Sequence, residues 1–546
     1  MRLNLREVPF STRGSYMAFS YLEGKYQGKE VENGLYFRTV HGSASSSFLA
    51  RVRPVYERKQ IEYTYEAEPW ELRIITDKGT ARLVFADKDT IVIRGNLALE
   101  FDFMTEGTMY TFAQPWKSGD KDFWMVNCFN GNSRYMVRAA KGTVRPEQKW
   151  SVSTAEYCRI CLEPGNAGEY LATLEENFED WADRKIEYDY DAILKEKAAE
   201  FERFYESMPS VPAVYADAAR VAAYVDWASI VAPCGVLKRE SMFMSKNWMC
   251  NVWSWDHCFN AMALAYHNPK EAWDQFLVMF DFQKPSGNIP DSVNDAKIIH
   301  NYCKPPIHGW TLRKLMGIMA ISHEQLMEAY EKLSKWTYWW LNCRDENGDG
   351  LCEYTHGNDS GWDNATAFAE LPPVTLPDLA AFLVLQMDVL AEVAEKLGLT
   401  QITYAEEILE VGDGKIKVKR HIDGGVETVE GPLPIVITVN GSAAPCRPRN
   451  AKLVQKYKHA KTVTEKQQGN LDYTDLYDKR DYLNLAEWSV ADVNGDLAQC
   501  GLSGSPTKVK AIQNIVFQAK ESKTISGSDR DVEDLIVELL ANHTIG

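Results

Sequence analysis

The period of the apolar residues changes twice along the chain, which excludes a single homogeneous fold. Residues 1–185 contain short alternating runs such as ARLVFAD (81–87) and DTIVIRGNLALEFDFM (89–104), separated by Gly, Asp and Lys turns that are typical of antiparallel strands. From about residue 190 apolar residues recur three and four apart, which is typical of helices. After Leu399 short alternating runs return. The chain is therefore expected to hold several domains of different class.

Three domains follow from these changes of period. The first is predicted to be an antiparallel β-sandwich, the second all-helical and the third an α/β fragment, with boundaries at 1–185, 186–399 and 400–546. Tryptophan usage agrees, because fifteen of the sixteen tryptophans lie in residues 1–362 and only Trp488 follows.

Charge and composition exclude several classes of partner. The chain has 546 residues with 60 basic and 77 acidic side chains, and the net charge of −17 disfavours nucleic acid and anionic membrane surfaces. The first ten residues, MRLNLREVPF, lack the apolar run of a signal peptide, and no stretch of about 18 apolar residues occurs. We therefore expect a cytoplasmic protein that does not bind membranes.

The eleven cysteines do not form a metal-site pattern. The close pair Cys158 and Cys161 has no second pair to complete a zinc site, so we expect reduced, mostly buried cysteines and no metal ion. The loop DENGDGLCE (345–353) imitates a calcium loop, but Glu353 comes too early for an EF-hand. A turn between helices is the preferred interpretation.

The last third contains three recognisable segments. KIKVKR (415–420) and VETVE (426–430) alternate on either side of a Gly-rich turn, which predicts a β-hairpin. The apolar run PLPIVITV (432–439) predicts a strand buried on both faces, and SDRDVEDLIVELL (528–540) an amphipathic helix.

Four loops of the helical region combine aromatic and polar residues. They are WSWDHCF (253–259), GNIPDSVND (287–295), CKPPIHGW (303–310) and GNDSGWDNA (357–365). A sugar presents apolar C–H faces and a rim of hydroxyls, so a sugar pocket needs flat rings beside Asp, Asn, Lys and His. These loops supply that mixture if they converge at one end of the domain. The alternative is that their tryptophans are core residues, as expected for Trp336, Trp339 and Trp340.

Three of these loops, WSWDHCF, PPIHGW and above all DSGWDNA, resemble glycoside hydrolase family 63 and its mannosylglycerate-hydrolase-like relatives. The resemblance covers residues 1 to about 398. It implies a β-sandwich packed on an (α/α)6 barrel of twelve helices, which hydrolyses terminal α-linked glucosyl or mannosyl units with inversion and without a cofactor. It further implies that Asp363 is the general acid and that the substrate contacts Trp255, Asp256, Lys304, Trp310, Trp362 and Asn364.

The chemistry of inversion agrees with the role implied for Asp363. One carboxyl must protonate the leaving oxygen while a carboxylate about 6.5–9.5 Å away activates water. Desolvation beside Trp362 would favour the protonated form of Asp363. Asp359 is the competing acid, at a position where the family usually carries a structural residue. Asp363 could alternatively cap the segment ATAFAEL that follows it.

The region that carries the second carboxylate of this family is missing. Residues 400–546 resemble instead the C-terminal part of the electron transfer flavoprotein beta subunit, in ITYAEEILEVGDGKIKVKRHIDGGVETVEGPLPIVITVN, CGLSGSPTKVK (500–510) and LIVELLANHTIG. The changeover lies near AEKLGL (394–399). The chain is thus interpreted as a chimera whose glycosidase part is an incomplete, impaired barrel.

The alternative function is electron transfer or docking through this tail. The resemblance would then imply FAD or AMP as cofactor and an electron transfer flavoprotein alpha subunit as partner. The main nucleotide-binding loops of that family lie upstream of the changeover and are missing, and NGSAAPCRPR (440–449) departs from the family pattern. An incomplete barrel would also leave an apolar edge, for which the sequence nominates Leu379, Phe382, Leu383, Leu390 and Leu397.

Overall fold

The computed structural model divides into two compact units, residues 1–441 and 442–546, which are described separately. The structure describes the chain except for residues 27–28, 43–47, 106–108, 119–120, 178–187, 267, 347–349, 370–372, 423–424, 445–455, 470–473, 498–524, 527 and 542–546. In the described part of the chain no helix is long and apolar enough to span a membrane. Nine cysteines are described; none is disulfide-bonded and seven are buried.

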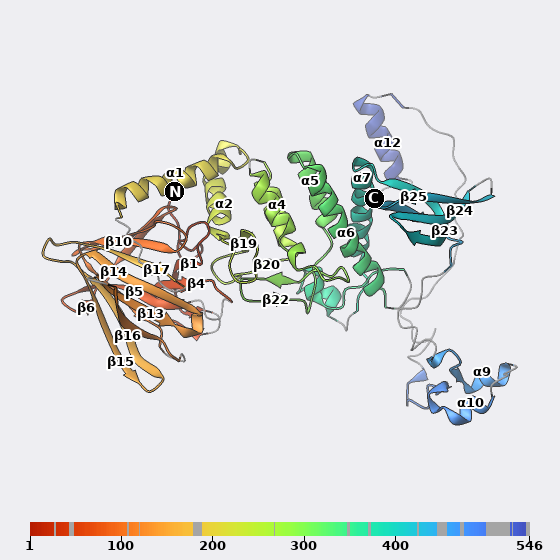
Figure 1. The fold of residues 1–546 in the computed structure, drawn as a ribbon, viewed down its shortest axis with the longest axis horizontal. Helices are drawn as coiled ribbons and strands as arrows, with labels where there is room; N and C mark the ends of the chain where they lie inside the picture. The colour runs from red at the N-terminus through yellow and green to blue at the C-terminus, as the bar shows by residue number, and fades with distance from the viewer. Residues whose placement is uncertain are drawn as a thin grey trace. The chain divides into compact units, whose positions relative to one another are not determined.

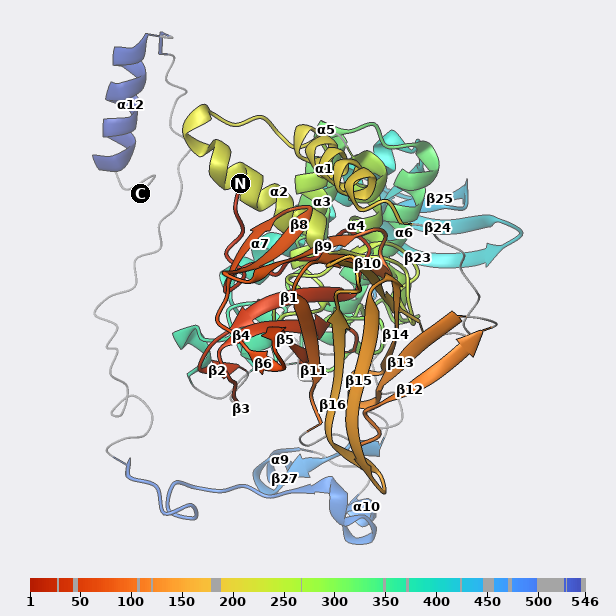
Figure 2. The same cartoon turned by 90° about the vertical axis from the view of Figure 1, so that its left-hand side faces the viewer.

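Two antiparallel sheets form the N-terminal part of the first unit (Figures 1 and 2). One contains, in spatial order, β1 (Met17–Leu22), β4 (Gly34–Thr39), β5 (Phe48–Tyr56), β11 (Ala98–Phe103), β16 (Thr154–Glu163) and β15 (Thr143–Ser151), with β6 (Lys59–Gln60) paired to β5. The other contains β12 (Phe112–Ser118), β13 (Lys121–Cys128), β14 (Ser133–Lys141), β17 (Tyr170–Glu176), β10 (Thr90–Gly95), β9 (Gly79–Phe85), β8 (Glu71–Thr76) and β7 (Thr64–Glu68). The antiparallel sheets predicted from the alternating pattern are therefore confirmed.

The two sheets share one hydrophobic core. Phe37 of β4 packs edge-on against Tyr135 of β14, with ring centroids 5.0 Å apart, and against Phe101 of β11 at 6.2 Å. Alternate residues on β5 and β11, including Arg53 and Asp102, point to the other face of their sheet. One face of each sheet thus lies in the core, which is the layering of a sandwich.

Seven α-helices follow the sheets in the described part of residues 186–399. They are α1 (Tyr190–Glu206), α2 (Ala216–Ser229), α3 (Asp256–Leu264), α4 (Pro269–Leu277), α5 (His308–Ile318), α6 (His323–Cys343) and α7 (Pro377–Lys396). Local signals set their starts: Asp189 caps α1, and Ser322 with Gln325 forms a capping box on α6. The helical region predicted from the period is confirmed, whereas the closed twelve-helix arrangement stays a prediction.

The apolar edge on α7 differs from the expected one. Leu379, Leu383 and Leu397 are buried in the core, and Phe382 and Leu390 are half-buried, so the prediction that these five face missing helices is wrong. They lie on the side of α7 that packs on α5 and α6, where Gly309 permits close approach: a Cβ there would lie 2.6 Å from the Gln386 Cα. The large apolar side chains that α7 exposes are instead Val384, 63% exposed, and Met387, 41% exposed.

A four-stranded sheet ends the first unit. Its spatial order is β25 (Gly425–Pro432), β24 (Lys415–Ile422), β23 (Thr400–Gly412) and β26 (Ile435–Val439). The predicted hairpin is confirmed as the β24–β25 pair. The prediction that 432–439 is buried on both faces is wrong, because β26 is an edge strand paired on one side with β23 and half-buried to exposed.

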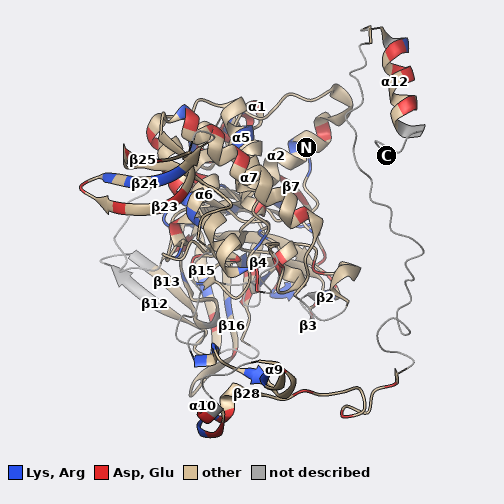
Figure 3. Ribbon diagram, turned by 90° about the vertical axis from the view of Figure 1, so that its right-hand side faces the viewer, with Lys and Arg blue, Asp and Glu red and all other residues tan. Residues whose placement is uncertain are grey.

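This sheet has its own small core and a paired charge surface. Its buried residues, Ile402, Ala405, Ile416 and Val418, form a cluster separate from the main core. Basic positions along β24 lie beside acidic positions of the neighbouring strands (Figure 3). Their side chains pair, as in Lys415–Glu430 at 2.8 Å and Lys417–Glu410 at 3.1 Å. The predicted boundary at 399 coincides with the change from α7 to β23, although the compact unit continues to 441.

The second unit is described only in parts. Two short parallel strands, β27 (Lys461–Thr462) and β28 (Asn484–Leu485), pair beside α9 (Val463–Gln468) and α10 (Thr474–Lys479). The predicted terminal helix is confirmed as α12 (Asp529–Ala541). CGLSGSPTKVK and the second half of NGSAAPCRPR, residues 445–449, lie outside the described residues.

A buried histidine joins the sandwich to the helical region. His41 Nδ1 lies 2.8 Å from Asp295 Oδ2, and His41 Nε2 lies 3.4 Å from Glu176 Oε2. Tyr16 stacks on the imidazole with ring centroids 4.0 Å apart. Burial opposes the charged form, but the hydrogen bonds to the two carboxylates outweigh it and raise the pKa of His41 to about 9.

This pKa predicts a loss of stability in mild alkali. A histidine pKa of about 6.5 in the unfolded chain against about 9 in the fold corresponds to a stabilisation on the order of 3 kcal/mol. It is fully present below about pH 6.5 and is lost as the pH rises through 9. Urea unfolding at pH 6 and pH 9.5 measures this difference, and His41→Gln should flatten it. An equal pH dependence in the variant would show that other groups cause it.

Candidate functional site

The four loops nominated from the sequence converge in the structure. β20 (Val252–Trp253) pairs with β21 (Ser292–Val293), which pairs with β22 (Ile298–Ile299), so the first two loops lie side by side. The Ser254 N–H donates to the Asp291 carbonyl at 2.9 Å. The third and fourth loops join through Lys304, whose Nζ donates to the Asn358 carbonyl at 2.7 Å.

A buried ion pair lies where the loops meet. Lys304 Nζ lies 2.6 Å from Asp291 Oδ1, and Asn358 Nδ2 donates to the same oxygen at 3.1 Å. Desolvation raises the pKa of Asp291, although Lys304 and Asn358 act in the opposite direction. Asp256, in the first turn of α3, also has its pKa raised by desolvation, with Lys304 opposing and Asp291 reinforcing the shift. Two carboxylates and one ammonium therefore share one poorly solvated region.

Aromatic rings lie beside this polar cluster. Trp255 packs edge-on against Phe259 with centroids 6.3 Å apart, and Phe259 packs edge-on against Trp310 at 6.0 Å. Trp255 and Trp310 are half-buried and Phe259 is 47% exposed, so the row is accessible to a ligand. Flat rings beside hydrogen-bonding side chains are the features that a sugar ring requires.

The fourth loop touches Trp255 through a glycine. Gly361 has φ +70°, and a Cβ placed on it would lie 2.3 Å from Trp255 Cζ2. A side chain there would both strain the backbone and displace the indole ring.

We expect Gly361→Ala to lower the free energy of unfolding by about 2–3 kcal/mol, from left-handed strain and the clash with Trp255. Gly398→Ala is the matched control, because Gly398 has φ +63° and nothing within 4 Å of an added Cβ. The control should lose only about 1–2 kcal/mol, the strain alone. If denaturant unfolding showed equal losses in the two variants, the contact with Trp255 would contribute nothing to the free energy of unfolding.

Asp359 and Asp363 occupy very different environments. Asp359 is fully buried and accepts hydrogen bonds from Cys303 N at 3.1 Å, Thr355 N at 3.1 Å and Thr355 Oγ1 at 2.8 Å. Its carboxylate also lies 3.6 Å from Arg344 Nη1. It therefore ties the loop of Asp363 to the loop before α5, which is a structural role.

Asp363 and its neighbours Trp362 and Asn364 are exposed, with Trp362 at 64%. The desolvation of Asp363 expected beside Trp362 is thus not present in this structure. The suggestion that Asp363 caps the following helix is wrong, because the short helix Thr366–Phe368 begins after Ala365 and has no side-chain cap. The role of Asp363 stays a prediction.

The structure unites part of the predicted set and adds residues to it. Lys304 forms the ion pair with Asp291, Asp256 interacts with both, and Trp255 joins Trp310 through Phe259. Asp291, Asn358 and Phe259 were not nominated individually, although each belongs to a loop that the sequence had singled out. Of the DENGDGLCE turn only residues 347–349 lie outside the described residues, and the Gly350 N–H donates to Asp345 Oδ2 at 3.2 Å, which closes the turn.

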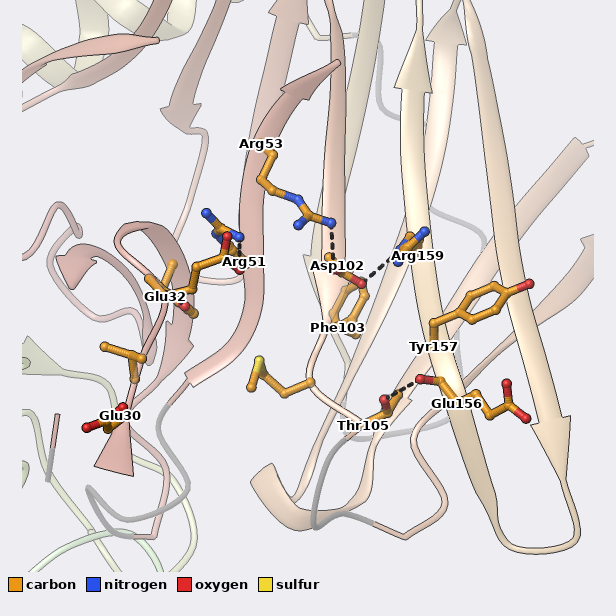
Figure 4. Close-up of a pocket in the computed structure, with 13 residues that line it drawn as sticks. Glu30, Glu32, Arg51, Arg53, Asp102, Phe103, Thr105, Glu156, Tyr157 and Arg159 are labelled. Carbon is orange, nitrogen blue, oxygen red and sulfur yellow. Dashed lines mark hydrogen bonds and ion pairs between the residues drawn. The ribbon is translucent and has the colours of Figure 1, made fainter. Parts of the chain in front are cut away.

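A cleft lies elsewhere, on the outer face of the seven-stranded sheet (Figure 4). It has a volume of about 750 Å³. Arg53 lies 2.5 Å from Asp102 Oδ2, and Arg159 lies 3.1 Å from Asp102 Oδ1 across neighbouring strands. Arg51 pairs with Glu32. Because these guanidinium groups are already paired, we interpret the cleft as a cross-strand charge ladder and place the candidate site at the loops.

Two family models match different parts of the chain. The mannosylglycerate hydrolase MGH1-like glycoside hydrolase domain matches residues 249–409, and the electron transfer flavoprotein domain matches residues 379–467. The first match contains all seven nominated site residues. The two matches overlap over residues 379–409, a range that includes the changeover inferred from the sequence. The chain therefore combines a glycoside-hydrolase-like and a flavoprotein-like part.

Curated relatives fall into the same two groups. Protein FixA of Rhizobium leguminosarum bv. phaseoli is 29% identical over 152 residues, covering 27% of this chain and 46% of the relative. Mannosylglycerate hydrolase MGH1 of Selaginella moellendorffii is 22% identical over 152 residues, covering 24% of this chain and 31% of the relative. The chain thus spans less than half the length of these relatives.

Solved structures give weaker similarities. A putative kojibiose phosphorylase from human microbiome has a TM-score of 0.45 at 11% identity, covering 72% of this chain and 66% of its own. The GH63 mannosylglycerate hydrolase from Thermus thermophilus, in complex with Tris and D-glycerate, has a TM-score of 0.21 at 21% identity, covering 28% and 45%.

Proposed function

We propose that residues 1–398 are the first part of an inverting (α/α)6 glycosidase that recognises a terminal α-linked glucosyl or mannosyl unit. The observation that carries this proposal is the convergence of Trp255, Asp256, Asp291 and Lys304 within the segment that matches the mannosylglycerate-hydrolase-like domain. Carboxylates accept hydrogen bonds from sugar hydroxyls, Lys304 donates to them, and the accessible aromatic rings offer flat surfaces to the sugar C–H groups.

In this proposal Asp363 protonates the leaving oxygen of the glycoside. Gly361, in the loop of Asp363, contacts Trp255 of the aromatic row formed by Trp255, Phe259 and Trp310. Asp359 anchors the start of this loop, because it accepts a hydrogen bond from Cys303 N. The opposite carboxylate, which would activate water, belongs to the part of the barrel that residues 400–546 replace. Substrate binding is therefore retained, whereas hydrolysis is impaired.

Weak binding of a monosaccharide tests the site separately from turnover. We expect the intact chain to bind glucose or mannose with a millimolar Kd, and Trp255→Ala to weaken binding at least tenfold, about 1.4 kcal/mol. Trp150→Ala is the control, because Trp150 is an exposed tryptophan on β15 of the sandwich. Isothermal titration calorimetry measures the dissociation constants of both variants. An equal loss in the two variants, or none in Trp255→Ala, would contradict the proposed site.

The second candidate function is docking of a flavoprotein partner by the tail. It is favoured by the match to the electron transfer flavoprotein domain and by exposed apolar residues of β23, such as Ile408 and Val411. An alpha-type subunit is the partner that this similarity suggests.

Within the described tail, neither β24 nor α12 offers a phosphate site for FAD or AMP. The phosphates of these cofactors need free cations or the N-terminus of a helix. Lys415, Lys417 and Arg420 of β24 are already paired with carboxylates, and α12 begins with Asp529 and Asp531. The purified chain should therefore show no flavin absorbance, and a stoichiometric yellow band would favour the second function over the first.

A further inference from the structure

Two histidines and a cysteine from α3 and α5 meet inside the helical region. His257 and Cys258 lie in the first turn of α3, and His308 begins α5. All three side chains are fully buried, and their possible ligand atoms lie within 4.8 Å of one another. The His257 and His308 ring centroids are 5.0 Å apart. This cluster has no part in the proposed glycosidase chemistry.

The orientation of His257 leaves one nitrogen available. Its Nδ1 lies 3.0 Å from the Trp253 carbonyl, which can only accept, so the proton is on Nδ1. The unprotonated Nε2 then lies 3.7 Å from Cys258 Sγ. A backbone carbonyl that fixes the tautomer of a histidine in this way is the usual support of a metal ligand.

His308 is the unusual member of the cluster. Neither of its ring nitrogens makes a hydrogen bond of acceptable geometry, although the Ser254 carbonyl lies nearby. The ring is packed against apolar neighbours, with Phe280 at 5.3 Å and Trp336 at 6.2 Å between centroids. A buried imidazole without a well-formed hydrogen bond is costly, and an ion bound to it would remove that penalty.

We propose that His257, Cys258 and His308 bind one soft monovalent metal ion, Cu(I). Thiolate and imidazole are donors that both Cu(I) and zinc accept, so the charge of the ion decides between them. One thiolate and one monovalent cation leave the group neutral, which suits an apolar interior, whereas a divalent ion would leave an uncompensated buried charge. The separation of 3.7 Å between Sγ and Nε2 fits a shared ion, since bonds of about 2.3 and 2.0 Å place such atoms roughly 3.5 Å apart.

The two histidines are already in the protonation state that a metal ion needs, whereas Cys258 must lose its proton. Burial lowers the pKa of His257 to about 4 and lowers that of His308, so both rings are neutral ligands at pH 7. Burial raises the pKa of Cys258 to about 12. Binding therefore forms one Cu–S and two Cu–N bonds and releases the thiol proton to solvent, with no change of oxidation state.

A second cluster has similar ligand atoms but cannot bind a metal ion. His41, Cys234 and Asp295 also lie within ligand distance of one another. Both nitrogens of His41 face carboxylates, however, and the ring is held as the cation. A protonated imidazole cannot bind a metal ion, so the proposal is confined to the first cluster.

Copper content of the full-length chain tests the proposal. The chain is produced in copper-supplemented medium and purified without oxygen, and the copper retained after gel filtration against a Cu(I) chelator is counted by mass spectrometry. We expect about one copper per chain, at least a tenfold loss in Cys258→Ser and in His308→Phe, and no loss in Cys161→Ser. Cys161 is a matched control, because it is equally buried but has no histidine beside it.

His308→Phe keeps a ring of similar size among Phe280 and Trp336, so its fold is expected to survive, which circular dichroism checks. X-ray absorption of the copper-loaded chain should show one sulfur and two nitrogen ligands. Absence of copper from the wild-type chain, retention in Cys258→Ser, or zinc in place of copper would each overturn the proposal. If His308→Phe does not fold, the copper content of Cys258→Ser decides whether the proposal stands.

Discussion

The chain as it stands is expected to hydrolyse glucosides, mannosides and trehalose hardly faster than solvent does. Joining residues 1–398 to the barrel end of a complete relative should raise turnover by at least about 10²-fold. An inverting glycosidase needs an acid and a base on opposite faces of the sugar ring, and a base displaced by about 1 Å already loses about 10²-fold. Sugar release measured for both chains under the same conditions gives the ratio.

The acids of the tail are poor substitutes for the missing base. Glu406 lies 3.3 Å from His421 and 3.9 Å from Lys419, and Glu410 lies 3.1 Å from Lys417, so both are paired inside their own sheet. Robust turnover by the unrepaired chain would show that the changeover near residues 394–399 has been misinterpreted.

Local pattern predicted the classes of structure well. The alternating runs of residues 1–185 became two antiparallel sheets, and the β24–β25 hairpin formed as expected. The prediction failed where the neighbour of an element decides its environment. PLPIVITV is apolar throughout, but β26 has a strand on one side only. Leu379 and Leu383 are spaced like an open edge, but they face α5 and α6. Periodicity identifies a face and does not identify what covers it.

The candidate site was likewise predicted from the sequence only in part. The composition of the loops indicated a sugar pocket, because flat rings and polar side chains occur together in them. The individual residues Trp255, Asp256, Lys304 and Trp310 came from the resemblance to the glycosidase family. Asp291 was not nominated individually, since only the pairing of β20 with β21 brings it to Lys304.

The metal-ligand cluster was missed for the same reason. His257 and His308 are 51 positions apart in the printed sequence, and no short spacing motif connects them. Only the packing of α3 on α5 brings them together.

The test of the general acid needs a chain that turns over, so it is made in the completed barrel. Asp363→Asn there is expected to lower turnover by about 10²–10⁴-fold, because the amide cannot protonate the leaving oxygen. Monosaccharide binding and the thermal midpoint should stay unchanged, since Asp363 is exposed and makes no part of the core.

Asp359→Asn distinguishes a chemical effect from a structural one. Asp359 is fully buried, accepts from Cys303 N and Thr355, and lies beside Arg344. Its loss should lower the thermal midpoint together with turnover, because a buried cation is left without its carboxylate. The two variants therefore differ in stability even if both lose activity. Unchanged turnover in Asp363→Asn would remove Asp363 as the acid, and a fall in its thermal midpoint equal to that of Asp359→Asn would assign it a structural role.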